Sequence, residues 1–567
     1  MAHFFRLPLC LWVLAFFGLG TGRLFTQTPT VGLTANEAGA FTGYTLIAPQ
    51  RSDSTYLIDQ CGRLVHAWGD EYEPGNSAYL LPDGRLLRTA SEGQTANVNF
   101  VAGGASDRIR LRDWEGALLW DWKLSNAQFR LHHDVAWMPN GHVLAIAWEA
   151  IGFDAGRAAG RSPANLGASV VWSEIILEVE PIFPDSGRIV WQWRAWDHLI
   201  QDFDSTRANF GTVAEHPERI DVNYLGLQSP NDPDWLHFNS IAYHPLRDEI
   251  MLSSREFCEF WIIDHSTNTL EAAGTTGGSA GRGGDLLYRW GNPEAYRAGS
   301  ATDKQLFAQH DAHWIADSLA DGGRVMVFNN GTDRPGGNAS SVDILELPQD
   351  RTGAYIVPNT GAAFGPLVPV WRYFAPVPTD FYAIFVSNAQ RLPNGNTFIN
   401  EGVFGHLFEI NPQGEVVWDY ISPVDDMGRI AQGDVPSAGP SGTLNNRTFR
   451  VYRYDPDYTG LAGRDLTPGA VLELNPLPDP CNPPIGVADG MVAPHFSFYP
   501  NPATTYLQVE LPGKASAWIE LRDVYGRAVW QGKIAPGSHR IPVAELPAGT
   551  YLVLGDHRPQ GRFVRTN

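Results

Sequence analysis

The stretch "LFEINPQGEVVWDY", residues 407–420, holds two short apolar segments joined by a Pro-Gln-Gly turn, and its second segment contains a tryptophan. Short apolar runs around a glycine turn predict paired antiparallel strands. Six variants of this unit occur along the chain, and their tryptophans are Trp68, Trp122, Trp193, Trp290, Trp371 and Trp418. Repeats of short strands are typical of β-propeller blades, each of which buries its faces on its neighbours. We therefore predict an all-β fold with a six-bladed β-propeller; a pair of β-sandwiches is the weaker alternative.

A second pattern follows several of these tryptophans: a strand that ends in the turn Pro-Asn/Asp-Gly. It occurs in "NSAYLLPDGRLL" (76–87), "HDVAWMPNGHVL" (133–144) and "SNAQRLPNGNTF" (387–398), and strands that begin at His237 and His310 occupy the same place. The first strand of each propeller blade lines the central channel, so residues at equivalent positions should meet near the axis. The positions are Asn76, His133, His237, His310 and Ser387.

The strand around His237 predicts an anion site. Side chains alternate along a strand, so His237 and Asn239 share one face, and Arg255 continues a face of the next strand. A guanidinium group matches the oxygens of a tetrahedral oxyanion, and histidine and amide groups add hydrogen bonds. The competing interpretation is a structural network in which buried polar groups simply satisfy one another.

The same alternation predicts that His132 and His313 point away from the site. Three converging histidines could also bind a metal ion, because histidine is a common zinc ligand. The sequence, however, contains neither of the zinc-binding motifs H-E-x-x-H and C-x-x-C. A metal site is therefore the second choice, and a metal-dependent hydrolase is a lower-ranked hypothesis.

The net charge, the N-terminal residues and the cysteines predict which partners the protein has and where it is located. The formal net charge of −21 repels phosphate backbones, so we expect no nucleic-acid partner. Residues 1–26 have the order of a signal peptide, with Arg6 before a short apolar run, and we expect no transmembrane segment after its removal. Without Cys10 the chain keeps Cys61, Cys258 and Cys481, which allow one disulfide at most.

The composition changes near the C-terminus. Residues 472–492 are rich in proline and predict a linker between the propeller, 27–471, and a further segment, 493–567. That segment alternates apolar and polar residues in short runs, which predicts a small β-sandwich.

Four motifs, in order and spacing, resemble the bacterial arylsulfate sulfotransferases. They are "HHDVAWMPNG" (132–141), "DWLHFNSIAYHPLRDEIMLSSR" (234–255), "QHDAHWI" (309–315) and "VFNNGTDR" (327–334), and the resemblance spans roughly residues 40 to 470. It implies a six-bladed propeller that moves a sulfuryl group from an aryl sulfate to a phenol without a nucleotide sulfate donor or a metal.

The resemblance also implies roles for individual residues. His310 matches the nucleophile that becomes a transient sulfohistidine, while His237 and Arg255 match the pair that holds sulfuryl oxygens. His133 matches another catalytic histidine. Asn239 and Asn330 lie in matching motifs and are expected to bind substrate as part of the pocket wall.

The C-terminal segment is similar to type IX secretion sorting domains, on the motifs "YPNP" (499–502), "DVYGRAVW" (523–530) and "LPAGTYLV" (546–553). This implies export through the periplasm, contact with the type IX machinery, and a secreted or cell-surface location. Two functional hypotheses result: an aryl-sulfate sulfotransferase, or a non-catalytic surface propeller that binds sulfated or other anionic ligands.

Overall fold

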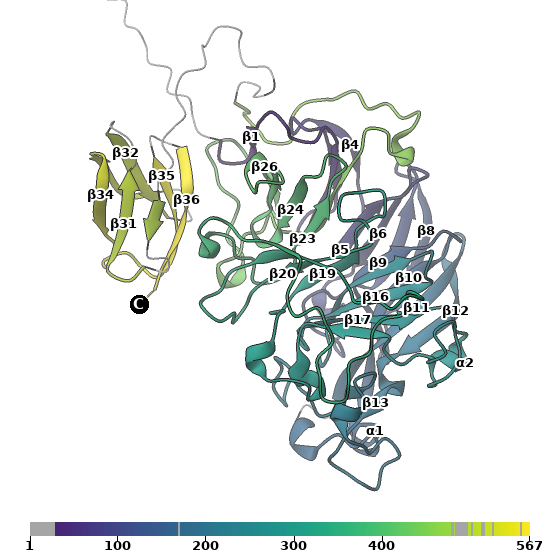
Figure 1. Cartoon of the computed structure of the whole chain (residues 1–567). Coiled ribbons are helices and arrows are strands. Elements are labelled where there is room, and N and C mark those ends of the chain that lie inside the picture. Colours follow the sequence, from purple (N-terminus) through teal and green to yellow (C-terminus); the bar gives the residue numbers. More distant parts are fainter. Residues whose placement is uncertain are drawn as a thin grey trace, which may run out of the picture.

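Short antiparallel strands form most of the regular structure in the computed structural model (Figure 1). It describes residues 29–167, 170–477, 481, 497–499, 503–511, 516–523, 527–555 and 558–566. The predicted signal peptide, 1–26, and most of the predicted linker lie outside these residues. The all-β prediction is confirmed, and the two short α-helices are α1 (Phe153–Ala158) and α2 (Thr269–Ala272).

Between Gly32 and Tyr454 most of the described strands form six antiparallel sheets of four or five strands. The first three are β5 (Glu73–Leu80), β6 (Leu86–Ser91), β7 (Arg108–Arg112) and β8 (Leu118–Lys123); β9 (Phe129–Trp137), β10 (Val143–Gly152), β11 (Val170–Ile182) and β12 (Ser186–Arg194); and β15 (Phe238–His244), β16 (Glu249–Ser254), β17 (Glu259–Asp264) and β18 (Tyr288–Trp290). The next two are β19 (His310–Trp314), β20 (Val325–Asn329), β21 (Ser341–Leu345) and β22 (Trp371–Tyr373); and β23 (Asn388–Arg391), β24 (Thr397–Glu401), β25 (His406–Ile410) and β26 (Val416–Ile421) with β1 (Gly32–Asn36). The sixth joins β2 (Tyr44–Pro49), β3 (Thr55–Ile58) and β4 (Leu64–Trp68) to β29 (Thr448–Tyr454). Two short pairs are β13 (Leu199–Ile200) with β14 (Ile220–Asp221) and β27 (Val424–Asp425) with β28 (Gly428–Arg429).

The inner strands contact one another in a closed circle. β5 contacts β9, and the contacts continue through β15, β19, β23 and β29 back to β5. The circle is closed by strands from opposite ends of the chain, because β29 pairs with β2 and β1 pairs with β26. Figure 1 shows purple β1 beside green β26. Residues at the starts of these inner strands are therefore brought toward a common centre.

The recurrent tryptophans lie in the fourth strands of the sheets, and several of them bond to the following sheet. The indole N–H of Trp68 donates to the carbonyl oxygen of Asp113 at 3.0 Å, that of Trp193 to Gly284 at 2.7 Å, and that of Trp418 to Gln60 at 2.8 Å. In each case the acceptor lies in the connection between the third and fourth strands of the following sheet. The tryptophan therefore fills the gap between sheets and satisfies its polar atom there.

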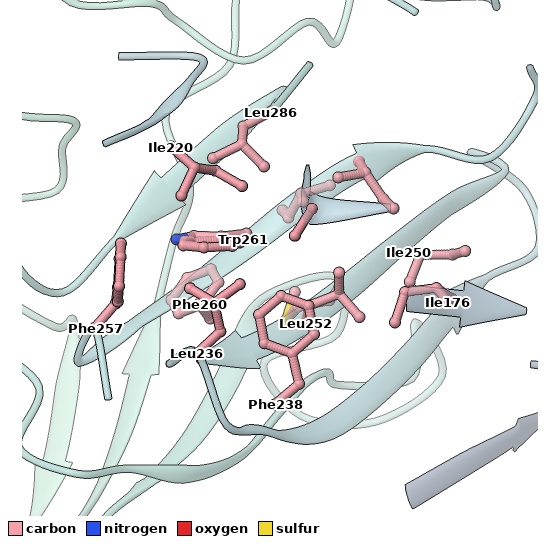
Figure 2. Packing of buried hydrophobic residues seen from close by; sticks show 14 of the residues in the cluster. Ile176, Ile220, Leu236, Phe238, Ile250, Leu252, Phe257, Phe260, Trp261 and Leu286 are labelled. Carbon is pink, nitrogen blue, oxygen red and sulfur yellow. The ribbon is translucent and has the colours of Figure 1, made fainter. Parts of the chain in front are cut away.

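The largest core cluster surrounds the sheet of β15 to β18 (Figure 2). Phe238 lies edge-on to Trp261, with ring centroids 5.4 Å apart, and Phe257 packs on the same indole. Every residue of β16 and β17 is buried, because neighbouring segments cover both faces of this sheet. The rigid cluster fixes the start of β15, where His237 lies.

Described residues that follow β29 in the chain pack against the sheets of the inner circle. Leu472 is buried against β1 and β2, and the backbone N–H of Leu474 donates to Ile430 at 2.9 Å. A disulfide joins Cys61 to Cys481, with Cα atoms 5.9 Å apart, which agrees with the limit of one disulfide. Within the described residues Cys258 is a buried free thiol.

The C-terminal segment forms two further antiparallel sheets. One holds β30 (Ser497–Tyr499), β31 (Tyr506–Leu511) and β34 (Gly537–Pro542); the other holds β32 (Ala517–Arg522), β33 (Ala528–Ile534), β35 (Gly549–Gly555) and β36 (Arg558–Arg565). Both contribute to one core of their own, which includes Val509, Ile541, Leu521 and Phe563. Among the described residues, the helices are all too short or too polar to cross a membrane.

Candidate active site

Residues with positive φ lie within or just before the inner strands. The backbone φ is 52° at His133, 49° at His237, 53° at Asp311, 85° at Ser387 and 133° at Asn76. Positive φ is uncommon outside glycine and often accompanies functional sites. The strand register also shifts at these places in β5, β9, β15 and β19, as in a β-bulge. The kinks turn side chains away from simple alternation and toward the centre.

This kink overturns the prediction for His132. Alternation placed its ring on the face opposite His133, yet the two Nδ1 atoms lie 2.8 Å apart. The left-handed backbone at His133 rotates its side chain toward that of its neighbour. His313, in contrast, lies nearer the far end of β19, where its Nδ1 is 3.4 Å from Asp311.

Ring contacts join the three predicted histidines through His133 and one phenylalanine. The rings of His133 and His237 are 4.6 Å apart, centroid to centroid. The ring of Phe449, from β29, lies 5.8 Å from His133 and 6.4 Å from His310. Residues distant in sequence thus form one compact group at the start of the inner strands.

Hydrogen bonds determine the tautomer of His310. The amide nitrogen of Asn330 donates to the carbonyl oxygens of Ala383, at 2.8 Å, and Val386, at 3.1 Å. Its Oδ1 therefore faces Nδ1 of His310, 2.8 Å away, and must accept the Nδ1 hydrogen. The backbone N–H of Val386 points at Nε2 of His310 at 3.2 Å, which requires a lone pair there. His310 thus presents an unprotonated Nε2.

The surroundings of His310 keep its ring neutral. Burial lowers the pKa of His310 well below its ordinary value, and the charges of Arg255 and Arg450 act in the same direction. Its side chain is 2% exposed. A neutral imidazole whose Nε2 lone pair is held only by the Val386 N–H, with positive charge nearby, can act as a nucleophile toward an anionic substrate once that hydrogen bond is released.

Asn239 positions His310 from the neighbouring strand. Its amide nitrogen donates to the carbonyl oxygen of Gln309 at 2.7 Å. The amide of Gln309 in turn donates to Ser253, Ser254 and Glu259 at distances between 2.8 and 3.0 Å. The residue before His310 is therefore fixed by the sheet that carries His237.

Arg255 lies just after β16 rather than within a strand face. Its backbone N–H donates to the carbonyl oxygen of His237 at 3.2 Å, which brings the two residues together. Its guanidinium pairs with the buried carboxylate of Glu256, a partner that the sequence pattern did not indicate. Burial raises the pKa of Glu256, and the charges of Arg255 and His237 oppose that rise.

Two carboxylates lie within hydrogen-bonding distance of histidines in this group. Oδ2 of Asp234 lies 2.5 Å from Nδ1 of His237, and Oδ1 of Asp234 accepts the indole N–H of Trp148 at 3.0 Å. Oε2 of Glu174 lies 2.7 Å from Nε2 of His132. Sequence reasoning missed Glu174 because it lies on β11, outside the histidine motifs.

Arg450 is the second missed residue. It is fully buried and donates to the carbonyl oxygens of Ser387 and Asn239, each at 2.8 Å. Its charge is balanced by Asp134 at 3.7 Å and Asp311 at 3.5 Å. Arg450 thus ties together the starts of several inner strands. Asn76 lies on the same circle, where Oδ1 accepts from the Gln50 side chain at 2.5 Å.

Within the described residues, no group of three or more His, Cys, Asp or Glu side chains is arranged to hold a metal ion. The positive groups near the histidines are instead guanidinium groups. Such an arrangement suits a monoanionic substrate with tetrahedral oxygens.

Comparison with protein families gives two matches. The model for arylsulfotransferase (ASST) matches residues 35–420, and the model for a secretion system C-terminal sorting domain matches residues 497–557. A search of curated proteins finds no match.

Solved structures show only distant likeness. A Bacteroides caccae protein of unknown function is 14% identical, with 68% of this chain and 95% of that chain covered and a TM-score of 0.37. A functionally unknown Desulfotomaculum acetoxidans protein is 9% identical, covering 73% and 100%, with a TM-score of 0.33. A virginiamycin B lyase from Staphylococcus aureus is 8% identical, covering 68% and 86%, with a TM-score of 0.29.

Proposed function

The chain belongs to the arylsulfotransferase family, and from this premise we propose that it moves a sulfuryl group from an aryl sulfate to a phenolic acceptor through a sulfohistidine at His310. Family membership indicates a sulfotransferase in general. The observation that carries the finer proposal is the tautomer of His310, because Asn330 and Val386 leave the lone pair on Nε2. The proposed reaction requires no nucleotide sulfate donor and no metal.

The proposed first step forms a bond between Nε2 of His310 and sulfur and breaks the bond between sulfur and the phenolic oxygen. The phenolate leaves, and the imidazole keeps its Nδ1 hydrogen, which Asn330 accepts. A second phenol then attacks the same sulfur, loses its proton, and returns His310 to its neutral state. This is covalent catalysis in two steps.

Other residues have supporting roles in this mechanism. Arg255, His237 and His133 would stabilise the charge that develops on the sulfuryl and leaving oxygens, and removing one such donor typically costs about 100- to 1000-fold in rate. The Val386 N–H can donate to a sulfuryl oxygen once sulfur reaches Nε2. Asn239 and Asn330 would shape the site through His310 rather than by contact with the acceptor.

The same proposal includes the architecture. The closed circle of inner strands supports a six-bladed propeller over residues 27–471 in which the histidines face one axial pocket. The two C-terminal sheets with a shared core support a small sandwich over residues 493–567, after a linker at 472–492.

An assay of purified protein with an aryl sulfate tests the function. Without an acceptor we expect a rapid release of about one phenol per enzyme, followed by slow turnover, because the sulfuryl group stays on the enzyme. Added phenols should restore continuous turnover and accept the group. Binding of the aryl sulfate without any release would favour the alternative, a surface propeller that binds anionic ligands, and loss of activity with a chelator would favour a metal-dependent hydrolase.

The sorting domain directs this protein to the cell surface or to secretion. Deletion from residue 496 onward is expected to leave the inner circle folded but retained in the periplasm, because the C-terminal core is separate from the others. Cell fractionation of the native host, with the full chain as control, measures this. Normal export of the shortened chain would show that the signal lies elsewhere.

A further inference from the structure

A chain of three buried side chains runs from β11 toward the site. Oε2 of Glu174 lies 2.7 Å from Nε2 of His132, and Nδ1 of His132 lies 2.8 Å from Nδ1 of His133. The exposed fractions are 0% for Glu174, 1% for His132 and 4% for His133. Within the described residues no hydrogen bond engages Nε2 of His133, whose ring packs on His237.

The chain is held rigidly in place. Trp148 stacks on His132 with centroids 4.1 Å apart and an interplanar angle of 9°. The backbone N–H of Phe238 donates to Oε1 of Glu174 at 2.9 Å, so that Oε2 is the oxygen that faces His132. Packing and hydrogen bonds thus set both the order and the direction of the three groups.

This geometry allows two protonation patterns. When Glu174 is protonated, its hydrogen lies toward His132, His132 donates from Nδ1 to His133, and Nε2 of His133 carries a hydrogen. When Glu174 is ionised, Nε2 of His132 donates to it, Nδ1 of His133 donates to His132, and Nε2 of His133 has a lone pair. One proton at Glu174 therefore decides whether Nε2 of His133 is a hydrogen-bond donor or an acceptor.

We propose that Glu174, His132 and His133 form a proton relay that protonates the departing phenolate and later takes the proton of the accepting phenol. The inference rests on the proposed sulfuryl transfer. In the first step the hydrogen on Nε2 of His133 moves to the phenolate oxygen, the Nδ1 hydrogen of His132 moves to Nδ1 of His133, and the hydrogen of Glu174 moves to Nε2 of His132. The second step reverses all three transfers, so both histidines begin and end neutral.

Burial supports the resting pattern in which Glu174 holds the proton. Burial raises the pKa of Glu174 well above its ordinary value, and the nearby charge of Asp234 raises it further, while the Phe238 amide lowers it. A raised pKa means that Glu174 is protonated over a wider pH range. Raising the pH through this pKa converts His133 from a donor into an acceptor.

The two histidines are kept neutral, as a relay requires. Burial lowers the pKa of His132, and His237 adds to the effect. Burial lowers the pKa of His133 as well, with further contributions from His237, His132, His310 and Arg450. A proton that enters the chain therefore does not stay on either ring.

The test compares two donors on one variant. Phenol has a pKa near that of tyrosine, about 10, so its phenolate needs a proton on leaving. The 4-nitrophenolate is far less basic and can leave without one. In Glu174→Gln the amide keeps the shape and can still donate to His132, but it cannot deliver a proton. We expect the burst rate with phenyl sulfate to fall about 100-fold, while the rate with 4-nitrophenyl sulfate changes less than about threefold.

The ratio of the two rates is the decisive quantity, since a misfolded fraction lowers both equally. Glu178→Gln is the matched control, because Glu178 lies on the same strand but contacts His142 and His265. Its ratio should equal that of the unchanged protein. Equal losses with both donors in Glu174→Gln, or no loss with either, would reduce Glu174 to a structural group and overturn the relay.

A second measurement separates the relay from the proposed function. Nuclear magnetic resonance of protein labelled with ¹⁵N in histidine reports which ring nitrogen carries hydrogen. The signals of His132 and His133 should exchange tautomers together as pH rises in the unchanged protein and remain fixed in Glu174→Gln. If no aryl sulfate gives a burst but this exchange occurs, the sulfuryl transfer is wrong and the proton path stands. If the tautomers do not respond to Glu174, the relay is wrong whatever the activity.

Discussion

His310→Asn is expected to remove the acceptor-independent burst and to lower sulfuryl transfer by about 10⁴-fold or more, because losing a covalent nucleophile leaves only binding and charge stabilisation. Rapid-quench assays with 4-nitrophenyl sulfate measure both quantities. Mass spectrometry of the unchanged protein should place the sulfuryl group on His310. Since burial lowers the pKa of His310, its lone pair should stay available at pH 6.5, and the burst should persist there.

The matched control is His216→Asn, which removes a half-exposed histidine on the turn before β14 (Ile220–Asp221). It should keep the full burst. A sulfuryl adduct on another residue, or unchanged transfer by His310→Asn, would favour direct transfer between substrates and leave His310 as a structural histidine.

Arg450→Met is expected to give the largest loss of stability. The side chain is fully buried, and its removal would leave Asp134 and Asp311 without their shared partner. Breaking a buried ion pair in this way typically costs about 3 to 5 kcal/mol. The midpoint of urea unfolding, followed by tryptophan fluorescence, should therefore move to lower urea concentration.

Arg188→Met provides the comparison for Arg450. Arg188 pairs with Glu180 but its side chain is 66% exposed, so the loss should be below about 1 kcal/mol. If Arg450→Met unfolded at the same urea concentration as Arg188→Met, Arg450 would not hold the inner strands together.

The repeated sheets could be predicted because several of the interfaces between them use the same side chain. Trp68, Trp193 and Trp418 recur in sequence since each fills a gap and donates to the next sheet. That requirement is local to the strand and its turn, so it appears as a readable pattern. His133 could be located by counting back from its Pro-Asn-Gly turn, whereas His310 was located by the matching place of its strand after a tryptophan unit.

The remaining parts of the site depend on features that no short pattern shows. Strict alternation failed for His132 because His133 adopts a left-handed backbone. Glu174 and Arg450 reach the site only through the packing of separate strands, and Arg450 requires β29 to return beside β2. Sequence spacing within one motif contains no information about such pairings.

The return of β29 to β2 also governs how the chain can fold after export. Residues 44–49 form a strand whose partner at 448–454 emerges some four hundred residues later, so an early edge stays unpaired for most of translocation. Folding rates fall as contacting residues become more distant in sequence. A strand edge that has not yet met its partner is prone to aggregation. Ring closure is thus expected to be a late step, and a nascent chain that stops before Thr448 would expose β2 as a template for intermolecular pairing.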